Sequence, residues 1–316
     1  MEFTLENDKF VNMTVLEVLR HDFHFPGHLL PGTAFLLMGF WWIYNALDIY
    51  FSDYKDTDAS ENACLMRDCD PDLEMNLSKN SASIRRRTFT ATYNGEMPGL
   101  LHCEGFYKLL YASVDLGCHV WVVCNGGNPI VEGQHMTIYI FFIIDAFVNI
   151  LHHTRLGCRF PKGTEFILPS ITWIVFGFLF LSHKHGKDAI QIYYHSTLAW
   201  VAISVGVMSL VQFKYDEQVL VALVRGISCA LAGSWLYQIA FSFHNPLNGI
   251  TQIYVQQAME NHSPEHDHNT VLGVMRASSY LTWHLIGIIL IVGILYKFVS
   301  ERNTSSAIYY ERIGCC

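Results

Sequence analysis

The stretch TEFILPSITWIVFGFLFLS, residues 164–182, decides the fold class. It approaches the ~20 apolar residues that an α-helix needs to cross the ~30 Å hydrocarbon core of a bilayer. The composition agrees, since 51% of the 316 residues are hydrophobic and only 15% are charged. A soluble domain typically carries about 25% charged residues. The sequence therefore predicts a membrane protein.

Further apolar stretches of similar length lie on either side of residues 164–182. Because lipid offers no partner for backbone N–H and C=O groups, these stretches are expected to be helical, and none shows the alternation of a membrane β-barrel. The sequence predicts an all-α, seven-transmembrane helix bundle over residues 28–300. Its spans are predicted at 29–51, 100–123, 134–152, 164–182, 188–212, 217–243 and 275–299.

Basic residues are distributed unevenly between the two sides of these predicted spans. Most of them, including Arg85, Arg86 and Arg87, fall on the side that carries the carboxyl terminus. Since loops rich in Lys and Arg stay in the cytosol, the amino terminus is predicted to be lumenal or extracellular and the carboxyl terminus cytosolic. Residues 1–27 are then a lumenal tail and residues 301–316 a cytosolic tail.

The long loop at residues 52–98 is rich in Asp, Asn, Ser, Lys and Arg and poor in large apolar residues. We expect a disordered cytosolic insert, because such a segment buries too little apolar surface to fold. The same orientation makes Asn12 and Asn261 eligible for glycosylation and makes Cys315 and Cys316 candidate lipidation sites. The partner that the sequence indicates is the lipid bilayer. Nothing suggests nucleic-acid binding, and protein partners stay open.

Polar side chains inside the predicted spans follow helical spacing. In the second span Glu104, Lys108 and Asp115 fall at i, i+4 and i+11, which is one face of a helix. Similar stripes in other spans contain His135, Asp145, Gln191, His195, Ser234, Gln238 and His284. Because a charged side chain that faces lipid is costly, these stripes are expected to face the interior of the bundle.

Five of the predicted helices bring polar residues to similar depths, counted at ~1.5 Å per residue from the lumenal side. The mouth is formed by His135, His183, His185 and Gln238. The layer beneath it contains Asp115, His195, Ser234 and His284, with Asp145 slightly deeper. The sequence therefore predicts a polar cavity that opens to, or near, the lumen.

Imidazole and carboxylate groups together are ordinary ligands for zinc and similar divalent ions. The candidate metal ligands, with Zn²⁺ as the candidate cofactor, are His135, His185, His195, His284, Asp115 and Asp145. Asp145 and Ser234 are the candidate catalytic residues, and Glu104, Lys108 and Gln238 complete the polar core. Imidazole is also a proton carrier near neutral pH. A further interpretation is a hydrogen-bonded network that only holds the helices together.

Several blocks of the predicted spans have a recognisable order and spacing. They are GHLLPGTAFLLMGFWW at 27–42, QHMTIYIFF at 134–142, HKH at 183–185, GSWLYQIAF at 233–241 and WH at 283–284. In these blocks the chain resembles the transmembrane protein 45 family. The resemblance implies a seven-helix protein without an established activity. It also implies a location in the Golgi, in another secretory-pathway membrane or in the plasma membrane.

The chain departs from the pattern of that family at three positions. The resemblance implies an acid where the chain has Asn149, and an acid and a histidine where it has Gln191 and Tyr193. If members of the family hold a metal ion, these departures remove ligands from the third and fifth predicted spans.

Three functions are compatible with these observations, and whether the protein is an enzyme stays open. The first is a metal-binding membrane protein, in its most specific form a metal-dependent intramembrane hydrolase. The second is a proton- or ion-coupled transporter that uses the same cavity, because Glu104 and Lys108 extend the polar stripe most of the way across. The third is a trafficking or scaffold protein that acts through the loop 52–98 and the tail.

Overall fold

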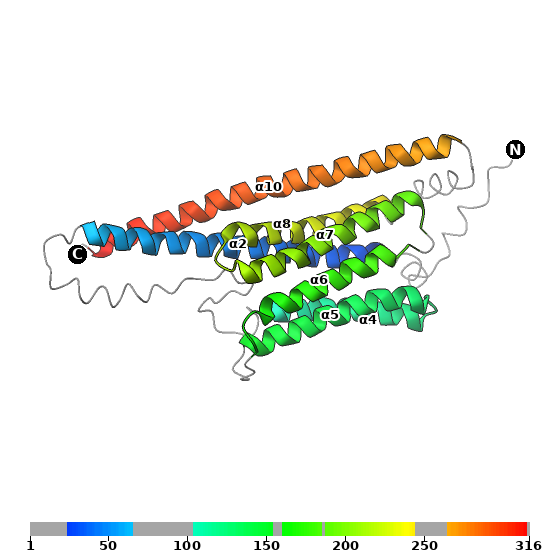
Figure 1. Ribbon diagram of the computed structural model, residues 1–316, viewed down its shortest axis with the longest axis horizontal. Helices are drawn as coiled ribbons and strands as arrows, with labels where there is room; N and C mark the ends of the chain where they lie inside the picture. Colours follow the sequence, from blue (N-terminus) through cyan, green and yellow to red (C-terminus); the bar gives the residue numbers. More distant parts are fainter. Residues whose placement is uncertain (1–23, 66–103, 154–159, 185–186, 244–263, 315–316) are drawn as a thin grey trace, which may run out of the picture.

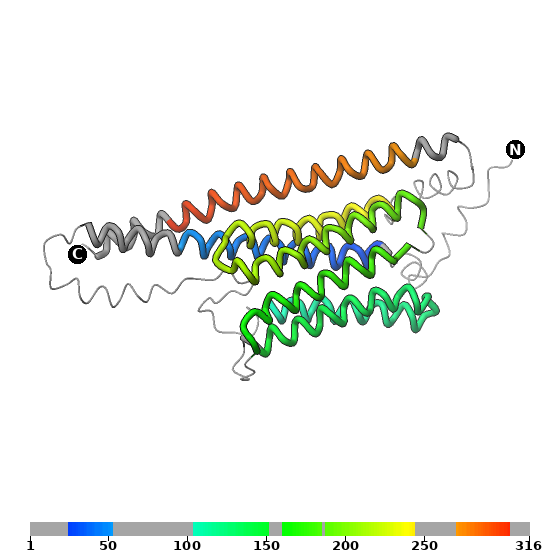
Figure 2. The backbone as a smooth tube through the Cα atoms, viewed as in Figure 1, coloured from blue at the N-terminus to red at the C-terminus, as the bar shows by residue number. Residues whose placement is uncertain are grey.

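The structure, a computed structural model, describes residues 24–65, 104–153, 160–184, 187–243 and 264–314. Within these residues it is all α and contains seven helices. In chain order they are α2 (His24–Leu65), α4 (Glu104–Cys124), α5 (Pro129–His153), α6 (Thr164–Ser182), α7 (Ala189–Lys214), α8 (Val219–Phe243) and α10 (Pro264–Gly314). The helices share a common long direction (Figure 1), and successive helices from α4 to α8 run antiparallel (Figure 2).

Six of these helices are long and apolar enough to cross a membrane. Their apolar segments are Phe25–Ser52, Pro129–Leu151, Thr164–Ser182, Ala189–Lys214, Val219–Phe243 and Thr270–Asn303. α4 is the exception, because it buries Glu104, Lys108, Asp115 and His119 and is too polar to qualify on composition alone. The prediction of an all-α bundle of membrane-spanning helices is confirmed in this form. The side of the membrane on which each end lies stays a prediction.

The ends of the helices agree with the sequence for α6 and differ for α2 and α10. The predicted span 164–182 coincides with α6. Residues 52–65, which the sequence assigns to a disordered insert, instead continue α2. They contain neither Gly nor Pro, and residues such as Ala, Glu, Lys and Leu favour the helix. α10 likewise continues to Gly314, through most of the predicted tail. Residues 66–98 lie outside the described residues.

α2 and α8 approach each other more closely than ordinary side chains permit. A Cβ atom on Gly39 would lie 2.5 Å from the backbone nitrogen of Ala230, and one on Gly233 would lie 2.5 Å from the backbone nitrogen of Leu36. Small residues at such crossings let the backbones of membrane helices approach and gain van der Waals contact. This crossing fixes α2 against α8 and positions the side chains that both helices send into the bundle.

Inward-facing side chains of α2 and α5 form layers because they recur every seven residues. On α2, His28, Phe35 and Trp42 have this spacing, which is close to two helical turns. On α5, His135 and Phe142 have the same spacing. The rings of Phe35 and Phe142 are in contact, with centroids 5.5 Å apart. An aromatic layer therefore separates a histidine layer from a charged layer deeper along the helices.

Candidate functional site

Five histidines form one cluster at the end of the bundle where α2 begins. They are His28 of α2, His119 of α4, His135 of α5, His183 after α6 and His195 of α7. The ring centroids are 4.9 Å apart for His119–His135, 4.8 Å for His135–His183, 6.1 Å for His183–His195 and 5.8 Å for His195–His28. Each ring therefore neighbours the next, and this imidazole cluster is a continuous line across five chain segments.

Two rings of the imidazole cluster are oriented by side-chain oxygens of α5. The Nδ1 atom of His119 lies 2.6 Å from Oε2 of Glu132, and both side chains are buried. The Nδ1 atom of His183 lies 2.7 Å from Oε1 of Gln134. Because a carboxylate or amide oxygen accepts, each Nδ1 carries the hydrogen, and Nε2 is the basic nitrogen of the neutral ring.

A third ring, His195, is oriented by its own helix. Its Nδ1 donates to the carbonyl oxygen of Gln191 at 2.8 Å, one turn earlier. Asp188 caps the start of α7 by accepting the backbone N–H of Gln191 at 2.7 Å. The neighbouring Lys187 is partly buried, and this burial lowers the pKa of its ammonium group, although Asp188 acts in the opposite direction. The entrance of the imidazole cluster therefore carries an incompletely solvated basic group.

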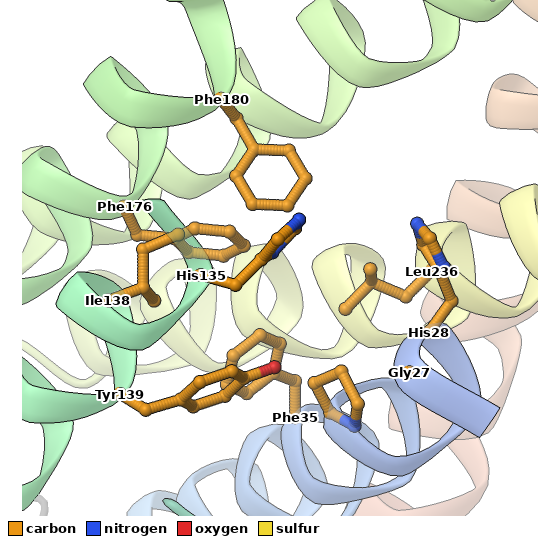
Figure 3. A pocket seen from close by; sticks show the side chains of 10 residues that line it. Gly27, His28, Phe35, His135, Ile138, Tyr139, Phe176, Phe180 and Leu236 are labelled. Atoms are coloured by element: carbon orange, nitrogen blue, oxygen red, sulfur yellow. The ribbon is translucent and has the colours of Figure 1, made fainter. Parts of the chain in front are cut away.

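A small pocket lies beside the imidazole cluster. Figure 3 shows the rings of His28 and His135 on opposite sides of it, with Phe180 at one end and Tyr139 and Phe35 at the other. Its volume is about 20 Å³, and a cavity needs roughly 10–15 Å³ of such space to hold one water molecule. The pocket can therefore hold one molecule of about the size of water between the two imidazoles.

A network of buried charges lies on the other side of the aromatic layer. The Nζ atom of Lys108 is 2.6 Å from Oε1 of Glu104 and 2.8 Å from Oδ2 of Asp145. The indole N–H of Trp42 donates to Oε2 of Glu104 at 2.9 Å, and the guanidinium of Arg225 lies 4.2 Å from the centroid of the Trp42 ring. We call these five residues the ion-pair network. It joins α2, α4, α5 and α8.

The charges of the ion-pair network are balanced, since Lys108 and Arg225 offset Glu104 and Asp145. Breaking such balance is costly, because an unpaired charge is expensive to keep away from water. The backbone N–H of Gly105 also donates to the side-chain oxygen of a neighbouring α5 residue, Asn149, at 3.1 Å. α4 and α5 are therefore held together by polar contacts at the level of the ion-pair network.

The buried face of α4 connects the ion-pair network to the imidazole cluster. Its polar members are Glu104, Lys108, Tyr111, Asp115 and His119, all of them buried and each three or four residues from the next. The residues of the predicted α4 stripe are thus buried in the bundle. Asp115 lies near the middle of α4 and interacts electrostatically with Tyr111 of the same helix and with Tyr139 of α5.

The structure does not bring His284 into this site. Its Nε2 lies 3.1 Å from Oε1 of Gln238, and its ring packs edge to face on Trp235 of α8. Trp235 in turn stacks on Tyr194, whereas the neighbouring His195 faces the imidazole cluster. His195 of α7 and His284 of α10, the predicted pair, therefore face different neighbours.

The predicted catalytic residues have other partners. Ser234 donates to the carbonyl oxygen of Leu231 within α8, at 3.1 Å. Asp145 is paired with Lys108. Among the described residues, no group of three His, Cys, Asp or Glu side chains is arranged to hold a metal ion.

Sequence reasoning missed part of the site. His119 extends the α4 stripe by one more turn beyond Asp115, and the same spacing rule would have found it. Glu132 lies three residues before His135 on α5, and this helical spacing is the signal that would have placed it beside the histidines. Arg225 was visible as a charge inside an apolar span, but its contact with α2 was not. His185, Asn12, Asn261, Cys315 and Cys316 lie outside the described residues.

Part of the chain matches a known protein family. Residues 162–297 match a family described as "Family of unknown function (DUF716)". The matched region contains α6, α7 and α8 and much of α10, and with them His183, His195 and Arg225.

Proposed function

Because the chain belongs to the DUF716 family, which corresponds to the transmembrane protein 45 family of multi-pass membrane proteins, we propose a function exercised within the membrane. That function is the transfer of protons through the bundle along α4. This proposal is the transporter function described above, with the proton as the ion and the buried face of α4 as the path.

One observation carries the proposal: ionisable side chains line the buried face of α4 almost from end to end. Side chains three or four residues apart on a helix have Cβ atoms about 5–6 Å apart, a distance that one water molecule or one side-chain movement can bridge. Ionisable residues inside a membrane are expensive, and chains of acids and histidines there are characteristic of proton relays. A purely structural role does not require such an unbroken sequence.

The two clusters suit different steps of proton transfer. In the imidazole cluster a neutral ring can accept a proton on Nε2 and release the other from Nδ1, so that neighbouring rings relay it. In the ion-pair network Lys108 is shared by Glu104 and Asp145. When one of these carboxylates is protonated, Lys108 pairs with the other carboxylate alone. Protonation therefore changes the ion pairs between α4 and α5.

The proposal is tested with the purified full-length protein in liposomes that contain a pH-sensitive dye. A potassium diffusion potential drives proton entry, and the initial rate of acidification is measured. We expect a protein-dependent rate, and a rate at least tenfold lower for His135→Asn. His284→Gln is the matched control, because His284 lies on another face of the bundle and should leave the rate unchanged. Liposomes with wild-type protein that acidify no faster than empty ones would refute proton transfer.

A second candidate, divalent-metal binding with Zn²⁺ as the probe, is favoured by one specific observation. His119, His135 and His183 lie side by side, with ring centroids 4.9 and 4.8 Å apart, and imidazole nitrogens are ordinary ligands of Zn²⁺. Elemental analysis of protein incubated with zinc should then give bound metal that His135→Asn loses. Equal metal content in both proteins would exclude this site.

We also propose that the imidazole cluster faces the lumen of the Golgi or of another secretory-pathway membrane. The uneven distribution of Lys and Arg residues supports this orientation. Glycan attached at Asn12 or Asn261 would support it, and glycan at Asn76 or Asn303 would reverse it.

A further inference from the structure

Asp115 differs from the other buried acids of α4 and α5. Glu104 and Asp145 share Lys108, and Glu132 is held by His119. Asp115 is only 1% exposed, yet its Oδ2 atom has no hydrogen-bond partner within the described part of the chain. Asp115 lies near the middle of α4, as far as this helix allows from the water at either end.

Among the residues that the structure describes, no cation compensates Asp115. The titratable groups with which it interacts are Tyr111 and Cys118 of α4 and Tyr139 of α5. None of them carries positive charge, and no described residue of α2, the other helix that packs on α4, supplies a counter-charge. A buried carboxylate without a counter-charge takes up a proton rather than remain ionised, so the surroundings of Asp115 favour the neutral carboxyl.

We propose that Asp115 is the proton-binding site of the bundle, a carboxyl that holds a proton between the imidazole cluster and the ion-pair network. This inference rests on the proposed proton transfer and names the group that carries the proton at mid-path. We assign the site to a proton and not to a metal cation, because no group of three His, Cys, Asp or Glu side chains is arranged to hold a metal ion in the part of the chain that the structure describes.

The transfer step moves a proton between two residues of α4. The O–H bond of the Asp115 carboxyl breaks and an N–H bond forms at Nε2 of His119, one helical turn away. The resulting imidazolium is stabilised by Glu132, whose carboxylate lies 2.6 Å from Nδ1 of His119. The imidazolium of His119 then passes a proton to the neighbouring ring of His135. A further proton, which enters the bundle at the ion-pair network, reprotonates the Asp115 carboxylate, and the two transfers together restore the starting state.

Infrared difference spectroscopy of the full-length protein in lipid tests this assignment directly, because a protonated carboxyl has a C=O stretching band that a carboxylate lacks. We expect such a band near neutral pH, and we expect Asp115→Asn to remove it. Asp216→Asn is the matched control: it is the same change at an acid that lies beside Lys162, outside the proposed path, and it should leave the band intact. A band that survives Asp115→Asn would refute the proposal.

A second variant separates loss of the proton site from loss of folding. Asp115→Glu keeps a carboxyl, and should restore the infrared band at a shifted frequency. In liposomes Asp115→Asn should lower the proton flux at least tenfold, and Asp115→Glu should retain part of it. Loss of the band on addition of sodium would assign the site to a metal cation and overturn the proposal.

The two proposals fail in distinguishable ways. A band assigned to Asp115 in a protein without proton flux would leave the proton-binding carboxyl in place and remove the transport function. Proton flux in a protein whose band is unaffected by Asp115→Asn would leave the transport function and remove Asp115 from it.

Discussion

At the scale of single residues, Lys108 is the side chain on which the balance of buried charge depends. Lys108→Met leaves Glu104 and Asp145 with Arg225 as the remaining cation of the ion-pair network. Removing one partner of a buried pair destabilises a protein by about 3–5 kcal/mol. We expect a clearly lower Tm in thermal unfolding of the purified protein.

The double variant Lys108→Met/Asp145→Asn provides the internal control. It removes one charge of each sign and leaves Glu104 balanced by Arg225, so we expect it to be more stable than Lys108→Met alone. A double-mutant cycle then gives a large coupling energy between the two sites. Additive losses of Tm would show that charge balance is not what stabilises this region.

Lys187 should make stability depend on pH near the entrance of the imidazole cluster. Folding lowers the pKa of its ammonium group by burial, so the unfolded chain binds this proton more tightly than the folded one. The resulting penalty is fully present below the folded pKa and disappears as pH rises past the unfolded value of about 10.4. Lys187→Gln should therefore raise the Tm at neutral pH, and its advantage should shrink at alkaline pH.

The comparison for Lys187 is made with Lys184→Gln, because Lys184 is exposed. That change should leave the pH profile of the Tm close to that of the wild type. An advantage of Lys187→Gln that persists undiminished at high pH would mean that removal of the side chain, and not of its charge, is responsible.

At the scale of helices, the crossing of α2 and α8 is the most sensitive contact. A Cβ on Gly39 would lie 2.5 Å from the backbone nitrogen of Ala230 and 2.8 Å from the carbonyl oxygen of Gly226. Gly39→Val must push the two helices apart, and overpacking of this kind costs about 1–3 kcal/mol or more. We expect a lower Tm, together with weaker proton transfer because Trp42 and Arg225 move.

Gly287→Val in α10 makes the same chemical change without the clash, because nothing lies within 4 Å of a Cβ at Gly287. Its Tm should stay close to that of the wild type. If both valine variants lose stability equally, the cause is the change in helix propensity and not the close crossing.

Helical periodicity predicted features that lie along a single helix. The span 164–182 coincides with α6, and the stripe Glu104–Lys108–Asp115 of α4 is buried as expected. Both follow from the repeat of 3.6 residues per turn and from the cost of exposing charge to lipid. The seven-residue recurrence of His28, Phe35 and Trp42 was equally available in the sequence.

The arrangement between elements could not be predicted in the same way. Counted along the sequence, His195 and His284 lie at similar depths in their helices. Depth does not determine which neighbouring helix a side chain faces. His284 contacts Gln238, whereas His195 faces the imidazole cluster. The pairing of Trp42 with Glu104 and of Arg225 with the Trp42 ring likewise depends on which helices become neighbours.

At the scale of the whole molecule, the outer surface is suited to lipid while the interior is suited to ions. α10 lies along one side of the bundle (Figure 1) and exposes Trp283, Leu290 and Ile294, each more than 60% exposed. A soluble protein would cover such a surface, and hydrocarbon covers it in a membrane. Charged groups lie inward, on α4, α5 and α8. A proton path across a bilayer requires this arrangement, with apolar residues on the outside and charged residues on the inside.

The direction of that path depends on which end of the bundle faces the cytosol. Cys124 is exposed and ends α4, at the end of the bundle that carries the imidazole cluster. Lys162 precedes α6 at the opposite end, and its side chain is 86% exposed. Two variants with a single cysteine, one retaining Cys124 and one carrying Lys162→Cys, therefore report on the two ends separately.

In sealed microsomes whose cytosolic face is outward, a membrane-impermeant maleimide should label Lys162→Cys directly. It should label Cys124 only after detergent opens the membrane, because the excess of basic residues places the other end in the cytosol. The reverse labelling pattern would place the imidazole cluster on the cytosolic side, where Lys187 and the histidines would meet cytosolic protons first. Labelling of both cysteines without detergent would contradict the placement of the two ends on opposite sides of a membrane, and with it a path along α4.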